Sequence, residues 1–259
     1  MTKQHDIRVL WLRSLDYQIC HALQKKLVEQ IIAGEGPETL LFVEHHPVIT
    51  TGRRTQRSDI LASADQLAQE GITIYDVERG GLATYHGPGQ LVIYPILNLR
   101  TRKLGIKEYV HLLESMVIEA LAHYGISGLI KKGFPGVWTS PSDKIASLGV
   151  AVLRGVCYHG IALNCSTNLN HFNMINPCGI DGVRMVSMKS ICEQTIPLDE
   201  LQRVCVEAFK TVFGIPCRIH EDLPEDIRTA LGLKPCPICW ACGACETVSQ
   251  SPYEGIEII

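Results

Sequence analysis

The sequence lacks the long hydrophobic runs and the surplus of one charge that mark several large classes of protein. None of its apolar stretches approaches the roughly 18 residues that a membrane-spanning helix needs. Its 24 Lys and Arg residues against 27 Asp and Glu give a net charge of −3, so no basic surface for nucleic acid or for an anionic membrane is expected. The first residues also lack the basic-then-apolar pattern of a secretory signal. The sequence therefore predicts a soluble, cytoplasmic protein.

Internal repeats and low-complexity linkers are also missing before about residue 232. With 46% hydrophobic residues in 259, the chain has ample material for one large core. We expect a catalytic domain over residues 1–231 and a cysteine-rich extension over residues 232–259. Without a secretory signal, the eleven cysteines indicate catalysis, metal binding or simple burial rather than a disulfide framework.

The spacing of apolar residues predicts an α+β fold. Consecutive strands over 144–153 and 157–165 are joined by a tight turn, as in a hairpin. Helical patterns stand apart from the strands instead of alternating with them, which favours mixed, largely antiparallel sheets with flanking helices. Residues 166–190 show no regular pattern. The remaining expected elements are helices over 16–33, 63–70, 107–124, 199–213 and 224–231, and strands over 40–44, 72–78, 90–97, 137–138 and 215–220.

Cys178 is the first candidate for chemistry. It lies between Pro177 and Gly179, which predict a sharp turn whose backbone amides can point at the thiol. Such a turn favours the thiolate, which is the nucleophilic form of cysteine. The alternative is a small buried apolar residue, which is what most free cysteines are.

Lys144 opens the strand Lys-Ile-Ala-Ser-Leu-Gly. A lysine that points inward there would be costly to bury unless it had a function, such as lowering the pKa of a thiol through its positive charge. The ordinary alternative is a strand-end lysine that faces water.

The stretch from Arg79 to Gln90 is the densest functional signal. Its four glycines let the backbone approach a ligand closely, and Arg79 and His86 add polar groups at either end. The spacing fits neither the dinucleotide-binding nor the phosphate-loop pattern. A plain hairpin connection is the alternative, because Gly-Gly and Pro-Gly are turn signals in their own right.

Polar residues also interrupt an apolar strand at His159 and Asn164. They are either hydrogen-bonded core residues or groups that line a site, and taken alone the core interpretation is the better one. The same holds for His45.

Together these stretches resemble the lipoyl(octanoyl) transferase family. The matching segments are Glu44-His45 with Pro47-Val48 and Thr50, Arg79–Gln90, Lys144–Gly149, His159–Asn164, and Asn176–Gly179. They occur in the order and at the spacing of that family and extend over roughly residues 5–220. The cysteine-rich tail is the one conspicuous departure from the pattern.

The resemblance implies a fold, a set of roles and a set of partners. The fold is that of the biotin and lipoate protein ligase catalytic domains. Cys178 takes the position of the acyl-thioester nucleophile, and Lys144 that of the lysine that lowers its pKa. The residues implied to line the acyl site are Arg79, Gly80, Gly81, Leu82, Ala83, Thr84, Tyr85 and His86, then Ser147, Leu148 and Gly149, then Gly160, Ile161 and Ala162.

The implied reaction moves an octanoyl group from octanoyl-acyl carrier protein to a specific lysine of lipoyl domains. The acceptors are the E2 subunits of 2-oxoacid dehydrogenases and the H protein of glycine cleavage. A thioester is a better acyl donor than an amide, so the transfer needs neither ATP nor any other cofactor. Backbone amides near Ser147–Gly149 are expected to stabilise the tetrahedral oxyanion.

Two rival interpretations remain. An ATP-dependent lipoate or biotin protein ligase shares the fold but needs a nucleotide site and no cysteine nucleophile. A non-enzymatic protein could instead carry a metal or cluster on the tail cysteines Cys236, Cys239, Cys242 and Cys245, although their spacing falls short of a ferredoxin-type run. For the tail itself, the alternative to metal or cluster binding is a tail with redox-sensitive thiols.

Overall fold

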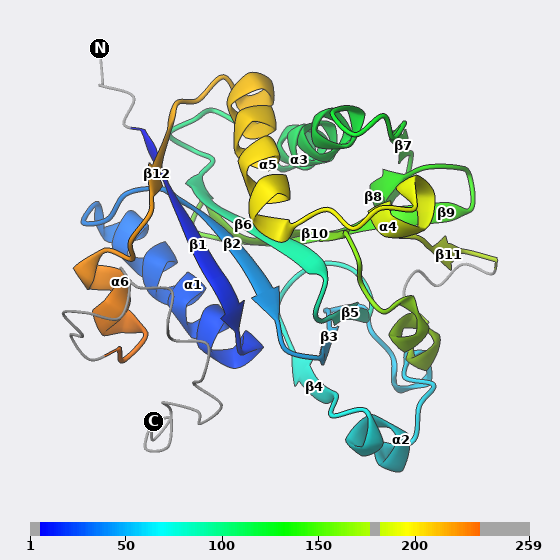
Figure 1. Ribbon diagram of the computed structural model, residues 1–259. Helices are drawn as coiled ribbons and strands as arrows, with labels where there is room; N and C mark the ends of the chain where they lie inside the picture. The colour runs from blue at the N-terminus through cyan, green and yellow to red at the C-terminus, as the bar shows by residue number, and fades with distance from the viewer. Residues whose placement is uncertain (1–5, 177–181, 234–259) are drawn as a thin grey trace.

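The computed structural model describes residues 6–176 and 182–233 (Figure 1). Cys178 and the tail cysteines Cys236, Cys239, Cys242 and Cys245 therefore lie outside the described residues. None of the helices within the described ranges is long and apolar enough to span a membrane.

A large mixed sheet runs through the centre of the described structure (Figure 1). β1 pairs in parallel with β2 and β12, whereas the β2–β6–β10–β9–β8–β7 path is antiparallel. A short parallel strand, β11, pairs with the start of β9. In spatial order the strands are β12 (Cys217–His220), β1 (Ile7–Leu15), β2 (Thr39–His45), β6 (Gln90–Asn98), β10 (Val156–Asn164), β9 (Asp143–Leu153), β8 (Phe134–Trp138) and β7 (Leu129–Lys131), with β11 (Arg184–Met185) off this path.

A second, three-stranded sheet lies at one end of the large one (Figure 1). Its order is β4 (Thr73–Asp76), β3 (Val48–Thr51) and β5 (Thr84–His86), with β3 parallel to β4 and antiparallel to β5. The Gly-rich stretch that the sequence singles out leads into β5 and on to β6. The small sheet therefore holds this stretch against the large sheet.

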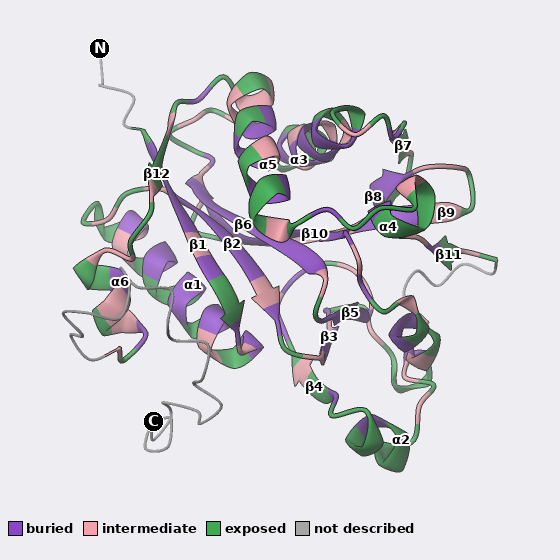
Figure 2. Cartoon of the chain, in the orientation of Figure 1, coloured by how far each residue is buried: buried purple, intermediate pink, exposed green. Residues whose placement is uncertain are grey.

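Helices cover both faces of the large sheet (Figure 1). α3 (Ile106–Ala122) and α5 (Leu198–Phe213) pack on one face, in a cluster with Leu113, Val117 and Phe209. α1 (Tyr17–Ala33) and α6 (Glu225–Ala230) pack on the other. Figure 2 shows that the central strands β6 and β10 are almost entirely buried, whereas part of β1 is exposed. The remaining helical segments are α2 (Ala64–Gln69), α4 (Met188–Cys192) and the 3-10 turns Arg57–Asp59 and Leu169–Met174.

The helix predicted over residues 16–33 shows why the local patterns succeed. Asp16 caps α1 by accepting hydrogen bonds from the backbone N–H groups of Gln18 and Ile19. Gly34 ends it in the left-handed conformation at a φ of 76°. The apolar stripe between these caps faces the sheet.

The α+β prediction is confirmed, and five strands are additions to it. β1, β3, β5, β7 and β11 were not expected from the sequence. The segment 166–190 is also more regular than expected, because its described part contains a 3-10 turn, β11 and the start of α4.

Candidate functional site

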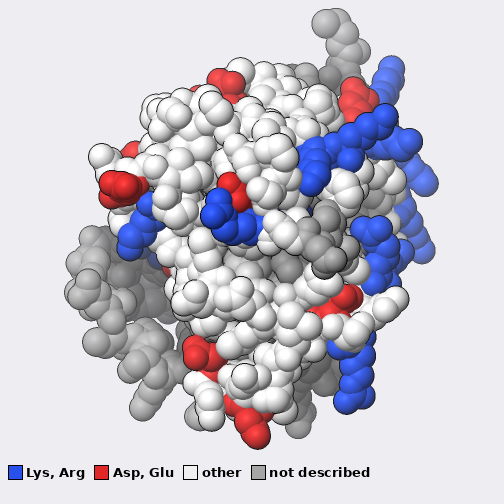
Figure 3. All heavy atoms as spheres, turned by 90° about the vertical axis from the view of Figure 1, so that its right-hand side faces the viewer, with Lys and Arg blue, Asp and Glu red and all other residues white. Residues whose placement is uncertain are grey.

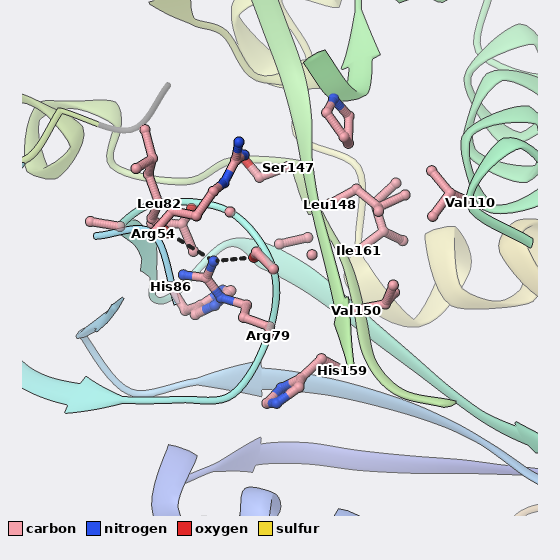
Figure 4. Close-up of a pocket in the computed structure, with 18 of the residues that line it drawn as sticks. Arg54, Arg79, Leu82, His86, Val110, Ser147, Leu148, Val150, His159 and Ile161 are labelled. Atoms are coloured by element: carbon pink, nitrogen blue, oxygen red, sulfur yellow. Dashed lines mark hydrogen bonds between the residues drawn. The ribbon is translucent and has the colours of Figure 1, made fainter. Parts of the chain in front are cut away.

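A cavity of about 750 Å³ lies between the Gly-rich stretch and the paired strands β9 and β10 (Figure 4). It is bounded by two walls, the strand wall of β9 and β10 and the loop wall of residues 79–86. Lys144 lies on its border. The expected acyl-site residues that line the cavity are Arg79, Gly80, Gly81, Leu82, Ala83, Thr84, His86, Ser147, Leu148, Gly149, Gly160, Ile161 and Ala162.

Tyr85 is the one expected residue that does not line the cavity. Because side chains alternate along a strand, the residue between Thr84 and His86 points to the other side of β5. Its ring is fully buried there against His171 and Phe172, with centroid distances of 4.8 and 5.6 Å. Tyr85 is therefore part of the core under the small sheet.

The strand wall is a regular antiparallel ladder. Gly149 pairs with Gly160, Leu148 with Ile161, and Ser147 with Ala162. Figure 4 shows Leu148, Val150 and Ile161 on the side of these strands that faces Val110 of α3, whereas the Gly-rich loop lies on the other side, against Gly149. This wall gives the cavity an apolar surface.

Glycine is required at position 160 of this ladder. A Cβ atom there would lie 2.1 Å from the carbonyl oxygen of Ile93 on β6, which is a backbone clash. The close packing of β10 on β6 therefore depends on a residue without a side chain.

The loop wall is held by Arg79, whose side chain is only 7% exposed. Its guanidinium donates to the carbonyl oxygen of Thr50 at 2.7 Å, to Thr50 Oγ1 at 2.8 Å, and to the carbonyl oxygens of Leu82 and Gly80 at 2.8 and 3.1 Å. These bonds show that Arg79 holds the loop in shape. The sequence had instead suggested a polar group that contacts a ligand. A further bond, from Gly80 N–H to the carbonyl oxygen of Val150 at 3.0 Å, ties the loop wall to β9.

His86 is also engaged by the protein. Its Nδ1 donates to Gln90 Oε1 at 2.7 Å, and Thr50 Oγ1 lies 3.5 Å from its Nε2. Burial lowers the pKa of His86 well below its usual value, so the ring is neutral at pH 7. It presents an uncharged surface to the cavity.

Two other polar residues noted in the sequence are satisfied core groups. His45 Nδ1 donates to the carbonyl oxygen of Leu15 at 2.9 Å, and its Nε2 accepts from the hydroxyl of Tyr94 at 2.9 Å. Asn164 accepts from Gln90 Nε2 at 2.9 Å and donates to the carbonyl oxygen of Val186 at 3.1 Å. Both support the walls of the cavity from behind.

Lys144 begins the buried part of β9 and is 7% exposed. The lysine is therefore buried, and the alternative of a strand-end lysine that faces water does not hold. Its Nζ lies 5.3 Å from the ring centroid of Trp138, a favourable cation–π contact. Gly136, at a φ of 125°, gives the lysine its space, because a Cβ at that position would lie 2.6 Å from Lys144 Cε. The Lys144 side chain thus lies against Gly136 and Trp138 of β8, and it borders the cavity.

Glu114 is a neighbour that the sequence analysis missed. It comes from α3, is 4% exposed, and accepts a hydrogen bond from Gly136 N–H at 2.9 Å. Burial raises the pKa of Glu114, while the hydrogen bond and the charges of His111 and Lys144 oppose that rise. Its signal in the sequence is an acidic residue next to Leu113 within the apolar pattern of 107–124.

The segment with Cys178 is flanked on both sides by described residues that the fold anchors. On its amino-terminal side, Asn176 N–H donates to the carbonyl oxygen of Asp59 at 2.7 Å. On its carboxyl-terminal side, β11 places Met185 opposite Lys144, and Arg184 forms an ion pair with Asp143 at 2.8 Å. The chain therefore returns to the start of β9 at Arg184, six positions after Cys178.

Most of the other scattered cysteines are structural. Cys20, Cys157, Cys165 and Cys205 are buried. Burial raises the pKa of Cys165 to about 11 and that of Cys205 to about 12, so these thiols are not ionised at pH 7. Simple burial, one of the alternatives for the cysteine count, accounts for these four.

The model of the lipoyl protein ligase A/B catalytic domain matches residues 16–210 of the chain. The octanoyltransferase of Syntrophobacter fumaroxidans is 47% identical over 195 residues, which cover 75% of this chain and 85% of that protein. The octanoyltransferase of Caldicellulosiruptor saccharolyticus is 38% identical over 226 residues, covering 86% and 96% of the two chains.

Solved structures with the same fold include lipoate-protein ligase A bound with ATP. It aligns with a TM-score of 0.70 at 16% identity and covers 88% of this chain and 93% of that one. A bi-partite lipoate protein ligase from Thermoplasma acidophilum aligns with a TM-score of 0.67, also at 16% identity, over 88% and 91% of the two chains. At that identity the likeness establishes the fold alone.

Proposed function

The chain belongs to the lipoyl protein ligase A/B catalytic domain family, and on that premise we propose that it is an octanoyltransferase of protein lipoylation. It takes octanoyl from octanoyl-acyl carrier protein and delivers it to a specific lysine of lipoyl domains. The observation that carries this proposal is that Lys144 and the apolar strand wall border one cavity. The same cavity thus has a lysine that can take part in the reaction and an apolar surface that can bind a fatty acyl chain.

In the proposed first step, the Cys178 thiolate attacks the carbonyl carbon of the octanoyl thioester. A C–S bond to Cys178 forms, the C–S bond to the carrier breaks, and the carrier leaves as a thiolate that takes its proton from Lys144, which is left as a neutral amine. The exchange joins similar bonds and needs no energy input. Lys144 favours the reactive thiolate through its positive charge.

In the second step, the neutral amine of the acceptor lysine attacks the acyl-enzyme. A C–N bond forms, the C–S bond to Cys178 breaks, and the proton of the amine passes to Lys144 or to the departing thiolate. Because an amide is more stable than a thioester, this step runs downhill without ATP.

The geometry of β9 offers a donor for the oxyanion of both steps. The β8–β9 pairing ends at Gly136 opposite Ser147, while the carbonyl of Val150 turns toward the loop wall to accept from Gly80. Backbone groups of alternate residues point to the same edge of a strand, so the N–H of Leu148 shares that edge. We assign the oxyanion to this amide, within the Ser147–Gly149 stretch.

The apolar strand wall accounts for recognition of the acyl chain. Each buried methylene contributes about 0.8 kcal/mol, so an eight-carbon chain gains useful affinity from Leu148, Val150, Ile161 and Val110. The rival ligase activity is supported only by structures at 16% identity, whereas relatives at 38–47% identity are octanoyltransferases.

The outer face of the molecule suits a partner with a negatively charged surface. On the side that bears β7, β8 and β9, Lys and Arg side chains gather along one edge (Figure 3). Such a field speeds the encounter with an acidic partner and weakens with salt.

We expect the reaction to take place in the cytoplasm.

Intact-protein mass spectrometry tests the covalent step. The protein is mixed with octanoyl-acyl carrier protein without ATP, and an octanoyl adduct that hydroxylamine removes is expected. Cys178→Ser abolishes the adduct, whereas Cys192→Ser, which changes a partly exposed thiol on α4, retains it. An adduct on Cys178→Ser at another residue would disprove the nucleophile. Amide formation that requires ATP would instead favour the ligase.

A further inference from the structure

Three potential metal ligands converge at the end of the cavity opposite Lys144. They are His21 of α1, Glu78 from the segment after β4, and His159 of β10. Glu78 Oε2 lies 3.0 Å from His21 Nε2 and 3.8 Å from His159 Nε2, and all three ligand atoms lie within 4.8 Å of one another. Three elements that are distant in the sequence thus aim one atom each at a common point.

These atoms are buried and lack a geometrically good hydrogen bond. His21 is 3% exposed and His159 is 1% exposed. Within the described part of the chain, His21 Nε2, His159 Nε2 and Glu78 Oε2 are close in distance but have no partner in hydrogen-bond geometry. A buried polar atom left in this way is costly, and here three such atoms face each other. A cation between them would satisfy all three.

The groups around the ligands hold them in place. The hydroxyl of Tyr17 lies 3.5 Å from His159 Nδ1, on the far side of the ring from Nε2. Gln24 Oε1 accepts from the backbone N–H of His159 at 2.9 Å, where the residue has an unusual φ of 58°. Lys25 Nζ binds the other oxygen of Glu78 at 2.8 Å. Partners of this kind orient metal ligands and fix their tautomers.

The charges around the cluster also suit a cation. Each imidazole presents its Nε2 to the common point, and the lone pair of a neutral imidazole nitrogen is a metal ligand. The opposing positive charges that face the cluster are Lys25, which is 50% exposed and screened by water, and Arg79, which is bonded to Thr50 and its own loop. The carboxylate of Glu78 offsets one charge of the ion.

We propose that His21, Glu78 and His159 form a site for a divalent transition-metal cation of the zinc type. Two imidazoles and one carboxylate are a common ligand set for such ions, with bonds of roughly 2.0–2.2 Å. The observed separations of 3.0 and 3.8 Å are near those between neighbouring ligands of one ion. Glu78 is 35% exposed, so water completes the coordination from the solvent side.

A bound cation would fix the floor of the cavity. His159 lines the cavity, and Glu78 directly precedes Arg79, which organises the loop wall. The ion would therefore join α1, the loop wall and β10 at one point. This role does not depend on the proposed acyl transfer.

Metal binding by the full-length chain tests the site. The four tail cysteines are first replaced by serine so that their thiolates do not take up the probe. Zn²⁺ affinity is measured by competition with a chelating dye, and Co²⁺ is added separately to report the ligand type by absorption. One equivalent of Zn²⁺ is expected, together with a Co²⁺ spectrum of nitrogen and oxygen ligation. The melting temperature should rise with Zn²⁺.

Variants locate the ion within the chain. His21→Ala and Glu78→Gln each should weaken Zn²⁺ binding by more than about 10- to 100-fold. Removing a residue that only hydrogen-bonds to a metal ligand already costs that much affinity, so removing a ligand itself should cost more. His123→Ala changes an exposed histidine on the far end of α3 and should leave the affinity unchanged. Glu78→Gln preserves side-chain size, so it serves if His21→Ala fails to fold.

Three results would overturn the proposal. The first is a serine-substituted protein that binds no Zn²⁺. The second is a Co²⁺ spectrum with a thiolate charge-transfer band, which would place the ion on a cysteine. The third is an unchanged affinity in folded Glu78→Gln.

Discussion

The two walls of the cavity are built in opposite ways. The strand wall is a regular ladder in which Leu148, Val150 and Ile161 supply apolar side chains and the backbone pairs with itself. The loop wall has little regular structure, and its shape depends on the hydrogen bonds of Arg79 and His86 to neighbouring backbone and side chains. One wall is held by backbone pairing and the other by a few buried polar side chains.

This difference separates the effects that substitutions should have. Backbone pairing survives a change of side chain, so variants of the strand wall should alter chemistry or selectivity and leave the fold intact. A buried polar side chain on the loop wall has no substitute, so its removal should cost stability. Each of the following experiments sharpens or breaks this distinction.

The largest effect is expected at Lys144, where the strand wall meets the reaction. Lys144→Ala removes the positive charge and the proton carrier, so turnover should fall by about 10²- to 10⁴-fold. Lys144→Arg keeps the charge but does not release a proton, so acylation of Cys178 should survive better than transfer to the lipoyl domain. Single-turnover measurements of the two steps check this. Unchanged turnover in Lys144→Arg would defeat the proton-transfer role.

The control for that charge is Lys132→Ala, which changes an exposed lysine near the same edge. Its turnover should match that of the parent protein. A similar loss in both variants would mean that general surface charge, and not the position of Lys144, matters.

Arg79→Met is expected to give the largest loss of stability. The substitution leaves the carbonyl oxygens of Thr50 and Leu82 buried without their donor. The free energy of unfolding should fall by about 3–5 kcal/mol, measured by urea denaturation. Arg57→Met, at an exposed position, should change it by less than about 0.5 kcal/mol. Equal stability of Arg79→Met and the parent would show that the loop wall does not depend on these bonds.

The buried histidines behind the loop wall predict sensitivity to acid. Burial lowers the pKa of His45 from 6.5 to about 4. In the interval between these values the unfolded chain binds the proton and the folded protein does not, so stability is full above pH 6.5 and falls as the pH drops toward 4. The contribution of His45 is about 3 kcal/mol at most. His45→Gln should flatten the dependence of unfolding free energy on pH, and an unchanged slope would contradict this assignment.

Local patterns in the sequence predicted much of this arrangement. The caps and apolar stripe of α1 and the hairpin of β9 and β10 are short-range features, and all are present. β1 was missed because its apolar run contains Arg8, whose partners lie far along the chain: Asp226 pairs with it at 2.7 Å, and Thr39 Oγ1 accepts from its Nε at 3.2 Å. β5 was missed because three extended residues within a Gly-rich stretch have no period to detect.

The site shows the same limit. The Gly-rich stretch and the strands at 147–149 and 160–162 were singled out, and the fold brings them to one cavity. Glu114 was not, although it is an acidic residue within the apolar pattern of 107–124. Tyr17, which also lines the cavity, was not, because the start of a helix explains it as a core residue. The convergence of His21 with Glu78 is a contact between distant parts of the chain, and no local pattern encodes it.

The smallest effect concerns acyl-chain length and tests the strand wall by itself. Leu148→Trp adds bulk to the apolar surface that Ile161 and Val110 share (Figure 4), so the space for the end of the chain shrinks. Selectivity should shift toward shorter acyl donors by about 10-fold in kcat/KM, the worth of one or two methylenes. Leu153→Trp on the same strand is 48% exposed and should leave selectivity unchanged. If both variants unfold alike in urea but only Leu148→Trp shifts the preference, the strand wall sets specificity without setting stability. A stability loss in Leu148→Trp as large as that in Arg79→Met would abolish the distinction between the walls.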